Sequence, residues 1–334
     1  MRHPELPVGA FLAAILVLIP VPWHWRARNI ATLAIMFWLF TINIINGVNS
    51  IIWAGNAIIR VPVWCDITTK IYVGSSYALP AATMCICKHL ELVASTRRVR
   101  VDHDDKRRRM IFESIMCFGI PAIFMALHYI VQGHRFDIVE DTGCTPAIYT
   151  SIASIMILLF PPLLLSTITF IYAGMALIHF IKRRISFSTH LQTSNSALTT
   201  TRYLRLIAMS VTEMVFGTFF NAYNIYSNVS LGLRPWTSWS DVHSNWGRIG
   251  QFPAIEIPAS LREREFLFWW AVPVSSFIFF LFFGFGEEGR KEYRKLYQWI
   301  RVKVFRKPVK PAVRLADSYG SAPRYEAVTL VVEA

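Results

Sequence analysis

The sequence predicts an all-α integral membrane protein: a bundle of seven transmembrane helices with its amino terminus outside and its carboxyl terminus inside. Of 334 residues, 54% are hydrophobic and only 16% are charged, and the mean hydropathy is +0.40. So few charged residues cannot cover the surface of a soluble domain. The chain also contains seven long stretches without Asp, Glu, Lys or Arg. Lipid is therefore the expected solvent, and disorder, collagen-like structure and a small disulfide scaffold are excluded.

The charge-free stretches set the number of crossings. A helix needs about 20 residues to cross the hydrocarbon layer, and only helices or closed barrels satisfy their backbone groups in lipid. These stretches are continuously apolar rather than alternating, which favours helices. They are residues 6–25, 29–59, 71–87, 114–134, 142–181, 214–233 and 266–286.

Two of the stretches need adjustment to become helices. The third extends past Lys70 and Lys88, whose long side chains can reach the membrane surface. The sixth can start at Leu206 and include Glu213. The longest contains Pro161-Pro162 without a polar turn around it, so we expect one long kinked helix and not two crossings. The expected crossings are 6–22, 29–54, 66–94, 110–131, 148–181, 206–229 and 265–285.

Basic residues set the orientation. The connections after the first, third, fifth and seventh crossings hold 25 Lys and Arg, whereas the amino terminus and the other connections hold seven. Because cytoplasmic loops carry the excess of Lys and Arg, we expect the amino terminus outside. We expect the first crossing to be a retained signal anchor, with Trp23-His24-Trp25 as an interfacial belt after it.

The chain is expected to have three parts. Residues 1–285 form the seven-transmembrane domain, residues 286–307 a basic amphipathic cytoplasmic helix, and residues 308–334 a disordered cytoplasmic tail. The apolar residues of the second part recur at helical spacing, which predicts a helix lying on the inner leaflet. They are Tyr293, Leu296, Tyr297, Ile300 and Val304.

The cysteines divide by compartment. Cys65 and Cys144 both fall on the outer side, where oxidising conditions allow a bridge. We expect a disulfide that ties the second outer loop over the mouth of the bundle, and two free thiols are the alternative. Cys85, Cys87 and Cys117 fall within helices and are expected to be small core residues.

Catalytic and metal-binding patterns are missing from the sequence. The nine histidines contain no His-x-x-x-His pair, and there is no G-x-S-x-G, phosphate-binding glycine loop or C-x-x-C. We therefore expect no enzyme, no metal site and no cofactor. A small-solute transporter and a seven-helix lipid hydrolase are the alternatives, although intramembrane charge and internal repeats are sparse.

Few polar residues lie within the crossings. Asn43, Asn46 and Asn49 recur every three residues in the second crossing and are expected to form interhelical hydrogen bonds. Glu213 lies about two turns into the sixth crossing, and intramembrane ionisable groups are functional candidates. We expect Glu213 and Lys88 to form a latch between helices three and six.

Seven helices with basic inner loops resemble a G-protein-coupled receptor, but not of the rhodopsin-like class. Helix three ends with Lys88-His89-Leu90-Glu91-Leu92-Val93 in place of Asp/Glu-Arg-Tyr, and helix seven has Pro273 without Asn-Pro-x-x-Tyr. Four other stretches resemble the fungal mating-pheromone receptors of the a-factor (lipopeptide) type, class D. They are Pro22-Trp23-His24-Trp25-Arg26-Ala27-Arg28-Asn29; Val63-Trp64-Cys65-Asp66-Ile67; Phe118-Gly119-Ile120-Pro121 through Leu127-His128-Tyr129-Ile130-Val131-Gln132-Gly133-His134-Arg135-Phe136-Asp137-Ile138 to Glu140-Asp141-Thr142-Gly143-Cys144; and Thr201-Arg202-Tyr203-Leu204-Arg205-Leu206.

The resemblance implies a multi-pass receptor of the plasma membrane that binds a secreted, farnesylated peptide mating pheromone. Binding would activate a heterotrimeric G protein through its Gα subunit and start a MAP-kinase mating response. The other partner is membrane lipid; nucleic acid is not expected, and a homodimer is left open.

A prenylated peptide needs an apolar slot and a few polar groups, and the outer half of the bundle offers aromatic and acidic side chains for both. Interface belts, core packing or a solvated loop would account for the same residues. The candidate pheromone contacts are Trp53, Trp64, Asp66, Tyr72, Tyr77, Asp137, Glu140, Tyr223, Tyr226, Trp269 and Trp270.

The inner helix ends offer basic residues to a Gα carboxyl-terminal helix, although positive-inside charge alone would place such residues there. We favour Arg202 and Arg205, because helix six is expected to move during activation. The full set is Arg97, Arg98, Lys182, Arg183, Arg202 and Arg205.

Overall fold

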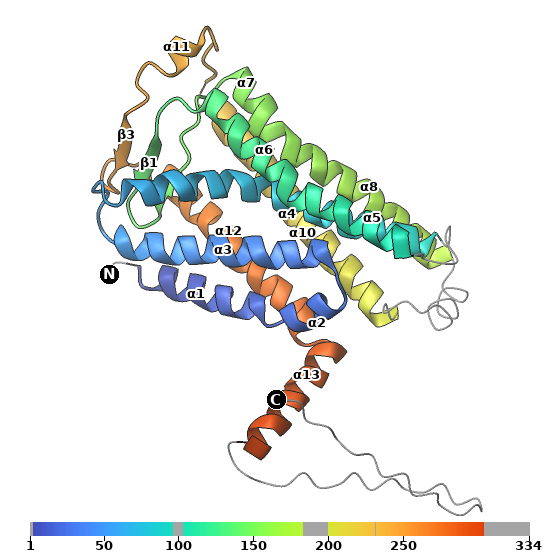
Figure 1. Ribbon diagram of the computed structural model, residues 1–334. Helices are drawn as coiled ribbons and strands as arrows, with labels where there is room; N and C mark the ends of the chain where they lie inside the picture. The colour runs from blue at the N-terminus through green and yellow to red at the C-terminus, as the bar shows by residue number, and fades with distance from the viewer. Residues whose placement is uncertain (1–2, 96–102, 183–199, 231, 304–334) are drawn as a thin grey trace, which may run out of the picture. The chain divides into compact units, whose positions relative to one another are not determined.

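The computed structural model describes residues 3–95, 103–182, 200–230 and 232–303, and it is mostly helical (Figure 1). The chain divides into two units, residues 1–290 and residues 291–334. The first unit is a helical bundle, and the second is treated separately below.

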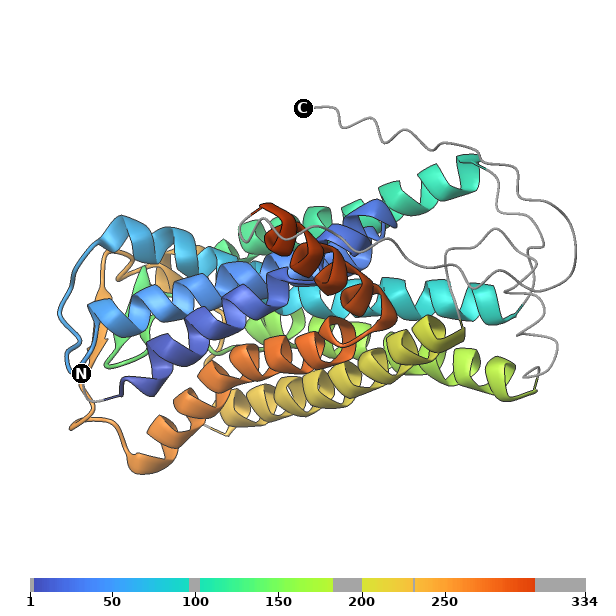
Figure 2. The same cartoon turned by 90° about the horizontal axis from the view of Figure 1, so that it is seen from below.

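Six helical segments of the described residues are long and apolar enough to cross a membrane. The helices that form them are α1 (Glu5–Leu18) with α2 (Val21–Arg26); α3 (Ile30–Ile52); α5 (His103–Ser114) with α6 (Ile120–Leu127); α7 (Ile152–Ser154) with α8 (Phe160–Lys182); α10 (Thr200–Val229); and α12 (Ala259–Gly284). The protein is therefore a membrane helical bundle, as the composition predicts. Figure 2 shows α10 and α12 running side by side.

The remaining long helix, α4 (Pro62–Ala94), has a different composition. It carries Asp66, Lys70, Lys88 and Glu91, and it packs against α3, α6, α8 and α10. More than half of its residues are buried, including Tyr77, which has no exposed surface. A helix enclosed by other helices need not be uniformly apolar, because its polar groups find partners inside the protein.

The first crossing differs from its expected bounds. The helix expected over 6–22 is interrupted after Leu18, and α2 begins at Val21. The interruption coincides with Pro20 and Pro22, since proline cannot donate the helical hydrogen bond. Trp23 and His24 are buried and do not form the expected belt, whereas Trp25 is exposed.

Pro161-Pro162 does not divide its helix. One helix runs from Ile152 to Lys182, as the sequence predicts, through a π-helical segment, η3 (Ile155–Leu159). A second π-helical segment, η1 (Ile115–Gly119), lies between α5 and α6 and precedes Pro121. That helix ends in a single 3₁₀ segment, η2 (His128–Val131). Wider turns of this kind reposition the carbonyl groups that a proline leaves without a donor.

The three asparagines of α3 each bond to a different partner, as expected. Asn43 donates to Ser276 of α12 over 2.7 Å, and Asn46 accepts from the hydroxyl of Tyr72 over 2.5 Å. Asn49 accepts from the indole of Trp64 over 2.8 Å. These bonds join α3 to α4 and α12 through side chains that carry no charge.

A small sheet covers one end of the bundle, which is called the sheet end below. Strand β1 (Phe136–Val139) pairs antiparallel with β2 (Gly143–Thr145) and parallel with β3 (Ile249–Phe252). A short helix, α11 (Trp239–Val242), precedes β3. The turn between β1 and β2 needs Gly143, because its φ is +84° and a Cβ there would lie 2.6 Å from Asn49.

The second unit begins within α13 (Glu287–Lys303), the helix that the basic segment after helix seven predicts. Its expected continuation to residue 307 and the expected disordered tail, residues 308–334, lie outside the described residues.

Candidate functional site

A cavity of about 550 Å³ opens at the sheet end between α3, α4, α8, α10, α12 and the strands. Ligand-binding cavities fall in the range of about 300–1,000 Å³. Its apolar lining comes from α4, η3, α8, α12 and the segment before α7. The apolar residues include Val73, Ile148, Leu158, Leu159, Pro162, Phe268 and Val272.

Three asparagines of α10 also line the cavity. Asn221, Asn224 and Asn228 are three and four residues apart, so they share one face of the helix. Asn228 donates to the carbonyl of Asn224 over 2.8 Å and to its side-chain oxygen over 2.9 Å. We did not single out these residues from the sequence. Their spacing within an apolar helix is the signal that could have found them.

Helix α12 adds charge and an unused donor. Arg264 donates to Glu265 over 3.0 Å, and both line the cavity. Trp269 also lines it, and its buried indole N–H has no hydrogen-bond partner among the described residues. Because a buried donor without a partner is costly, this N–H is available to an acceptor on a ligand.

Asp137 of β1 also lines the cavity and is held in place. His134 bonds its carboxylate over 2.6 Å, and Arg248 donates to the other ring nitrogen of His134 over 2.9 Å. Gly250 of β3 passes so close that a Cβ there would clash with the Asp137 carboxylate. The sheet therefore fixes the position of this negative charge.

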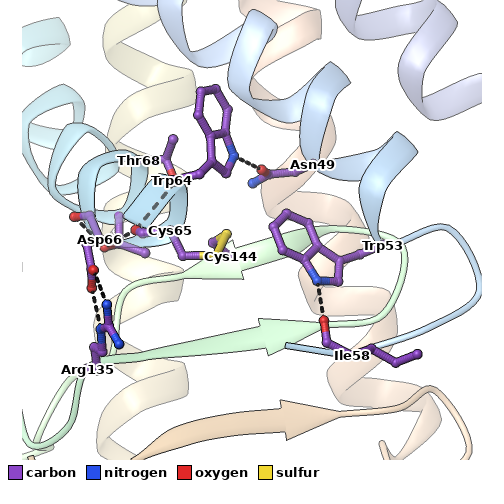
Figure 3. Close-up of a disulfide and its surroundings, with 10 residues drawn as sticks. Asn49, Trp53, Ile58, Trp64, Cys65, Asp66, Thr68, Arg135 and Cys144 are labelled. Atoms are coloured by element: carbon purple, nitrogen blue, oxygen red, sulfur yellow. Dashed lines mark hydrogen bonds and ion pairs between the residues drawn. A yellow bond between two sulfur atoms is a disulfide. The ribbon is translucent and has the colours of Figure 1, made fainter. Parts of the chain in front are cut away.

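A disulfide ties the sheet to α4, next to the cavity (Figure 3). Cys65 and Cys144, the pair that the sequence predicts, are joined with their Cα atoms 5.3 Å apart. Beside them, Arg135 donates to Asp66 through Nε over 2.9 Å and through Nη2 over 2.5 Å. These hydrogen bonds raise the pKa of Arg135 above its ordinary value. The disulfide and this ion pair both connect the start of α4 to the segment that carries β1.

The structure brings three of the eleven predicted pheromone contacts into the cavity, namely Tyr72, Asp137 and Trp269. The others lie elsewhere.

Two of them support the disulfide. The indole of Trp53 is fully buried and donates to the carbonyl of Ile58 over 2.9 Å, while that of Trp64 bonds Asn49 (Figure 3). Asp66 is paired with Arg135, and Glu140 accepts from the backbone of Ala254 over 2.7 Å.

The remaining four are packing or surface residues. Tyr77 donates to the backbone of Ile157, and Tyr223 stacks on Phe268. Trp270 packs against Gly9, and Tyr226 is 69% exposed on the surface of the bundle. Sequence position indicates the end of the bundle at which an aromatic residue lies, but not the face of the helix that carries it.

The predicted latch between Lys88 and Glu213 is wrong. The ammonium of Lys88, an exposed residue, lies 3.9 Å from the ring centre of Phe112, whereas Glu213 faces Ser275 of α12. The two residues project from α4 and α10 in different directions, which sequence depth cannot distinguish.

Six residues were predicted to contact Gα. They belong to α8 and α10 or to the segments of sequence that follow α4 and α8. Lys182 is exposed at the last residue of α8, and Arg205 is half-buried in the second turn of α10. Arg202 belongs to the first turn of α10, with its side chain outside the described part. Arg97, Arg98 and Arg183 also lie outside it.

Buried polar contacts join three helices at the end opposite the sheet. Glu113 accepts from the backbone N–H of Ala31 over 3.3 Å and pairs with Arg109 over 3.4 Å. Arg109 also contacts the ring of His89 over 2.9 Å. These contacts connect the start of α3, the end of α4 and α5.

The fold and the cavity define a class of protein: a helical membrane protein with a ligand-sized cavity at one end. The family model STE3, pheromone A receptor, matches residues 5–303. The chain belongs to this family, and the resemblance inferred from its sequence is confirmed.

Its relatives are receptors by name. The chain is 53% identical over 295 residues to the pheromone B beta 1 receptor of Schizophyllum commune, covering 88% of this chain and 54% of that protein. It is 31% identical over 299 residues to pheromone receptor 1 of Mycosarcoma maydis, covering 87% and 82%. It is 24% identical over 308 residues to the pheromone a factor receptor of Saccharomyces cerevisiae, covering 90% and 63%.

The chain spans about half the length of the Schizophyllum commune relatives it matches. No solved structure matches it. That the relatives are receptors supports a non-enzymatic protein.

Proposed function

We propose that this protein is a G-protein-coupled receptor of the plasma membrane that binds a farnesylated peptide mating pheromone in the cavity at the sheet end. The observation that carries the proposal is that this cavity combines an apolar lining with a row of three asparagines on α10. A prenyl chain needs the first surface, and peptide amides and carbonyls need the second. Three charged side chains of the lining, Asp137, Arg264 and Glu265, would select the charge of the peptide.

The sheet end is the outer end in this proposal, and α4, the third crossing along the chain, adds to the six apolar ones and makes seven in all. The disulfide between Cys65 and Cys144 lies at the sheet end, and disulfides persist in oxidising compartments. The excess of Lys and Arg lies in the segments of sequence that this orientation assigns to the inner side, as the positive-inside rule requires. The basic helix α13 would then lie on the inner leaflet.

The opposite end would couple to a heterotrimeric G protein and, through it, to the MAP-kinase mating response. Basic side chains at the ends of α8 and α10, Lys182, Arg202 and Arg205, would meet the carboxyl-terminal helix of Gα. The signal would pass through α10 and α12, which line the cavity and continue toward this end.

The test is a reporter assay in mating-competent yeast that lacks its own receptor and carries a matched Gα. Cells expressing the chain are challenged with farnesylated and unprenylated forms of the same candidate pheromone peptides. A dose-dependent response to the farnesylated form alone is the expected result. An equal response to both forms would refute the role of the apolar lining. Silence of a surface-expressed protein against a broad peptide panel would refute the proposed receptor function.

A further inference from the structure

A second, smaller cavity of about 150 Å³ lies among α3, α4, α8, α10 and α12. It shares Ser76, Asn221 and Val272 with the larger cavity, so the two adjoin. Its polar lining includes one carboxylate, Glu213, and several hydroxyl groups. Among the described residues, no Lys, Arg or His lines it.

The carboxylate of Glu213 is poorly satisfied. Its Oε1 is buried and has no hydrogen-bond partner among the described residues. Its Oε2 is approached by the hydroxyl of Ser275 at 3.5 Å, which is long for a hydrogen bond. A charged carboxylate inside a membrane bundle is costly unless another group compensates it.

The hydroxyl groups around Glu213 have already used their protons. Thr83 donates to the carbonyl of Leu79 over 2.9 Å, Ser166 to that of Pro162 over 3.0 Å, and Thr169 to that of Leu165 over 2.8 Å. A hydroxyl that donates in this way keeps its lone pairs. Apart from the amide of Asn221, these side chains therefore offer mainly acceptors to the cavity.

We propose that this cavity binds a hydrated monovalent cation, sodium, with Glu213 as the charged ligand. A single carboxylate balances a single positive charge, and hydroxyl and carboxylate oxygens are the ligands that hard cations prefer. A water molecule occupies about 30 Å³ in the liquid, so the cavity holds the ion together with a few waters. The site adjoins the proposed pheromone cavity, but Glu213 lines only the smaller cavity and the test needs no pheromone.

The test measures thermal unfolding of the purified full chain in micelles by tryptophan fluorescence. Sodium chloride is titrated against choline chloride at constant ionic strength, and lithium and potassium chloride are run in parallel. We expect a saturable rise in the unfolding temperature with sodium, of about 3 °C at a concentration tenfold above the dissociation constant. Glu213→Gln should abolish this rise.

The matched control is Glu263→Gln, which removes an exposed carboxylate from α12 and should keep the full response to sodium. Glu213→Gln should also unfold at the same temperature as the wild type in choline chloride, or higher, because it removes a carboxylate whose Oε1 has no hydrogen-bond partner among the described residues. Two results would overturn the proposal. In the first, the wild type has the same unfolding temperature in sodium and in choline chloride, which would mean that Glu213 is protonated and binds no cation. In the second, the unfolding temperature of Glu213→Gln rises with sodium as much as that of the wild type, which would mean a general salt effect.

Discussion

The hydroxyl of Tyr77 on α4 donates to the backbone carbonyl of Ile157 in η3. In an α-helix this carbonyl would accept from residue 161, and in a π-helix from residue 162. Both positions are proline, and neither has an N–H. A buried side chain of a neighbouring helix therefore supplies the hydrogen bond that the two prolines remove.

The same arrangement occurs on α6. Pro121 cannot donate to the carbonyl of Cys117, and the indole of Trp38 on α3 donates to it over 3.0 Å. In both cases a proline four residues later leaves the carbonyl group without its helical donor. Water cannot satisfy such a carbonyl inside a membrane. The helix pairs are thus joined at the points where the prolines weaken them.

We expect Tyr77→Phe to destabilise the protein by about 1–2 kcal/mol, because the carbonyl of Ile157 loses its donor in a buried site. The measurement is thermal or denaturant unfolding in micelles. Tyr226→Phe is the control, since Tyr226 is 69% exposed on the surface of the bundle. Equal stability of the two variants would show that the bond contributes nothing.

A second substitution tests the cause. Pro161→Ala restores an N–H four residues after Ile157, so we expect Tyr77→Phe to cost less in the Pro161→Ala background than in the wild type. A double-mutant cycle of unfolding free energies measures this difference, with an expected coupling of about 0.5–2 kcal/mol. Additive effects would mean that the two groups do not compete for one carbonyl.

The continuity of this helix through Pro161-Pro162 could be predicted from the sequence, because no polar turn surrounds the prolines. The disulfide and the bonds of Asn43, Asn46 and Asn49 could also be predicted, since each follows from depth in the membrane and chemical type. The hydrogen bond from Tyr77 to the carbonyl of Ile157 could not be predicted from the sequence. It depends on the rotation of α4 about its axis, which packing against four neighbouring helices sets.

The same limit explains the errors at the site. Lys88 and Glu213 were expected to meet because their depths allow it, but their helices present them to Phe112 and Ser275. The uniformly apolar composition of the outer helices does not indicate which face of each lines the cavity. The spacing of Asn221, Asn224 and Asn228 carries that information for α10 alone.

The asparagine row gives a direct test of the cavity. We expect Asn224→Ala to raise the pheromone concentration for half-maximal response by about tenfold, the equivalent of one hydrogen bond to a peptide group. The reporter assay in yeast measures it, with surface expression checked in parallel. Asn245→Ala changes an exposed asparagine of the loop before β3 and should leave the response unaltered. A wild-type response of Asn224→Ala would place the peptide elsewhere.

The disulfide should stabilise the sheet end. Cys65 and Cys144 are 79 residues apart, and loss of a disulfide closing a loop of this size typically costs about 2–5 kcal/mol. We expect Cys65→Ser/Cys144→Ser to lower both the unfolding temperature and the pheromone potency. Reductant should reproduce the loss in the wild type and have no further effect on the double variant. A reductant effect of equal size in both would point to the remaining cysteines instead.

The end opposite the sheet should couple to the G protein through α10. We expect Arg202→Ala/Arg205→Ala to bind pheromone with unchanged affinity but to reduce nucleotide exchange on Gα at least fivefold, since two charged contacts would be lost. Labelled-pheromone binding and nucleotide exchange on the same membranes separate the two effects. Arg60→Ala/Arg262→Ala removes the same charge from the segment before α4 and the first turn of α12, so it should leave exchange unaltered.

Normal exchange by a well-expressed Arg202→Ala/Arg205→Ala variant would remove these residues from the coupling surface, because both assays then find the receptor intact. A loss of pheromone binding together with exchange would instead mean that the substitutions disturb the bundle, and Arg205, half-buried in α10, would then be a packing residue.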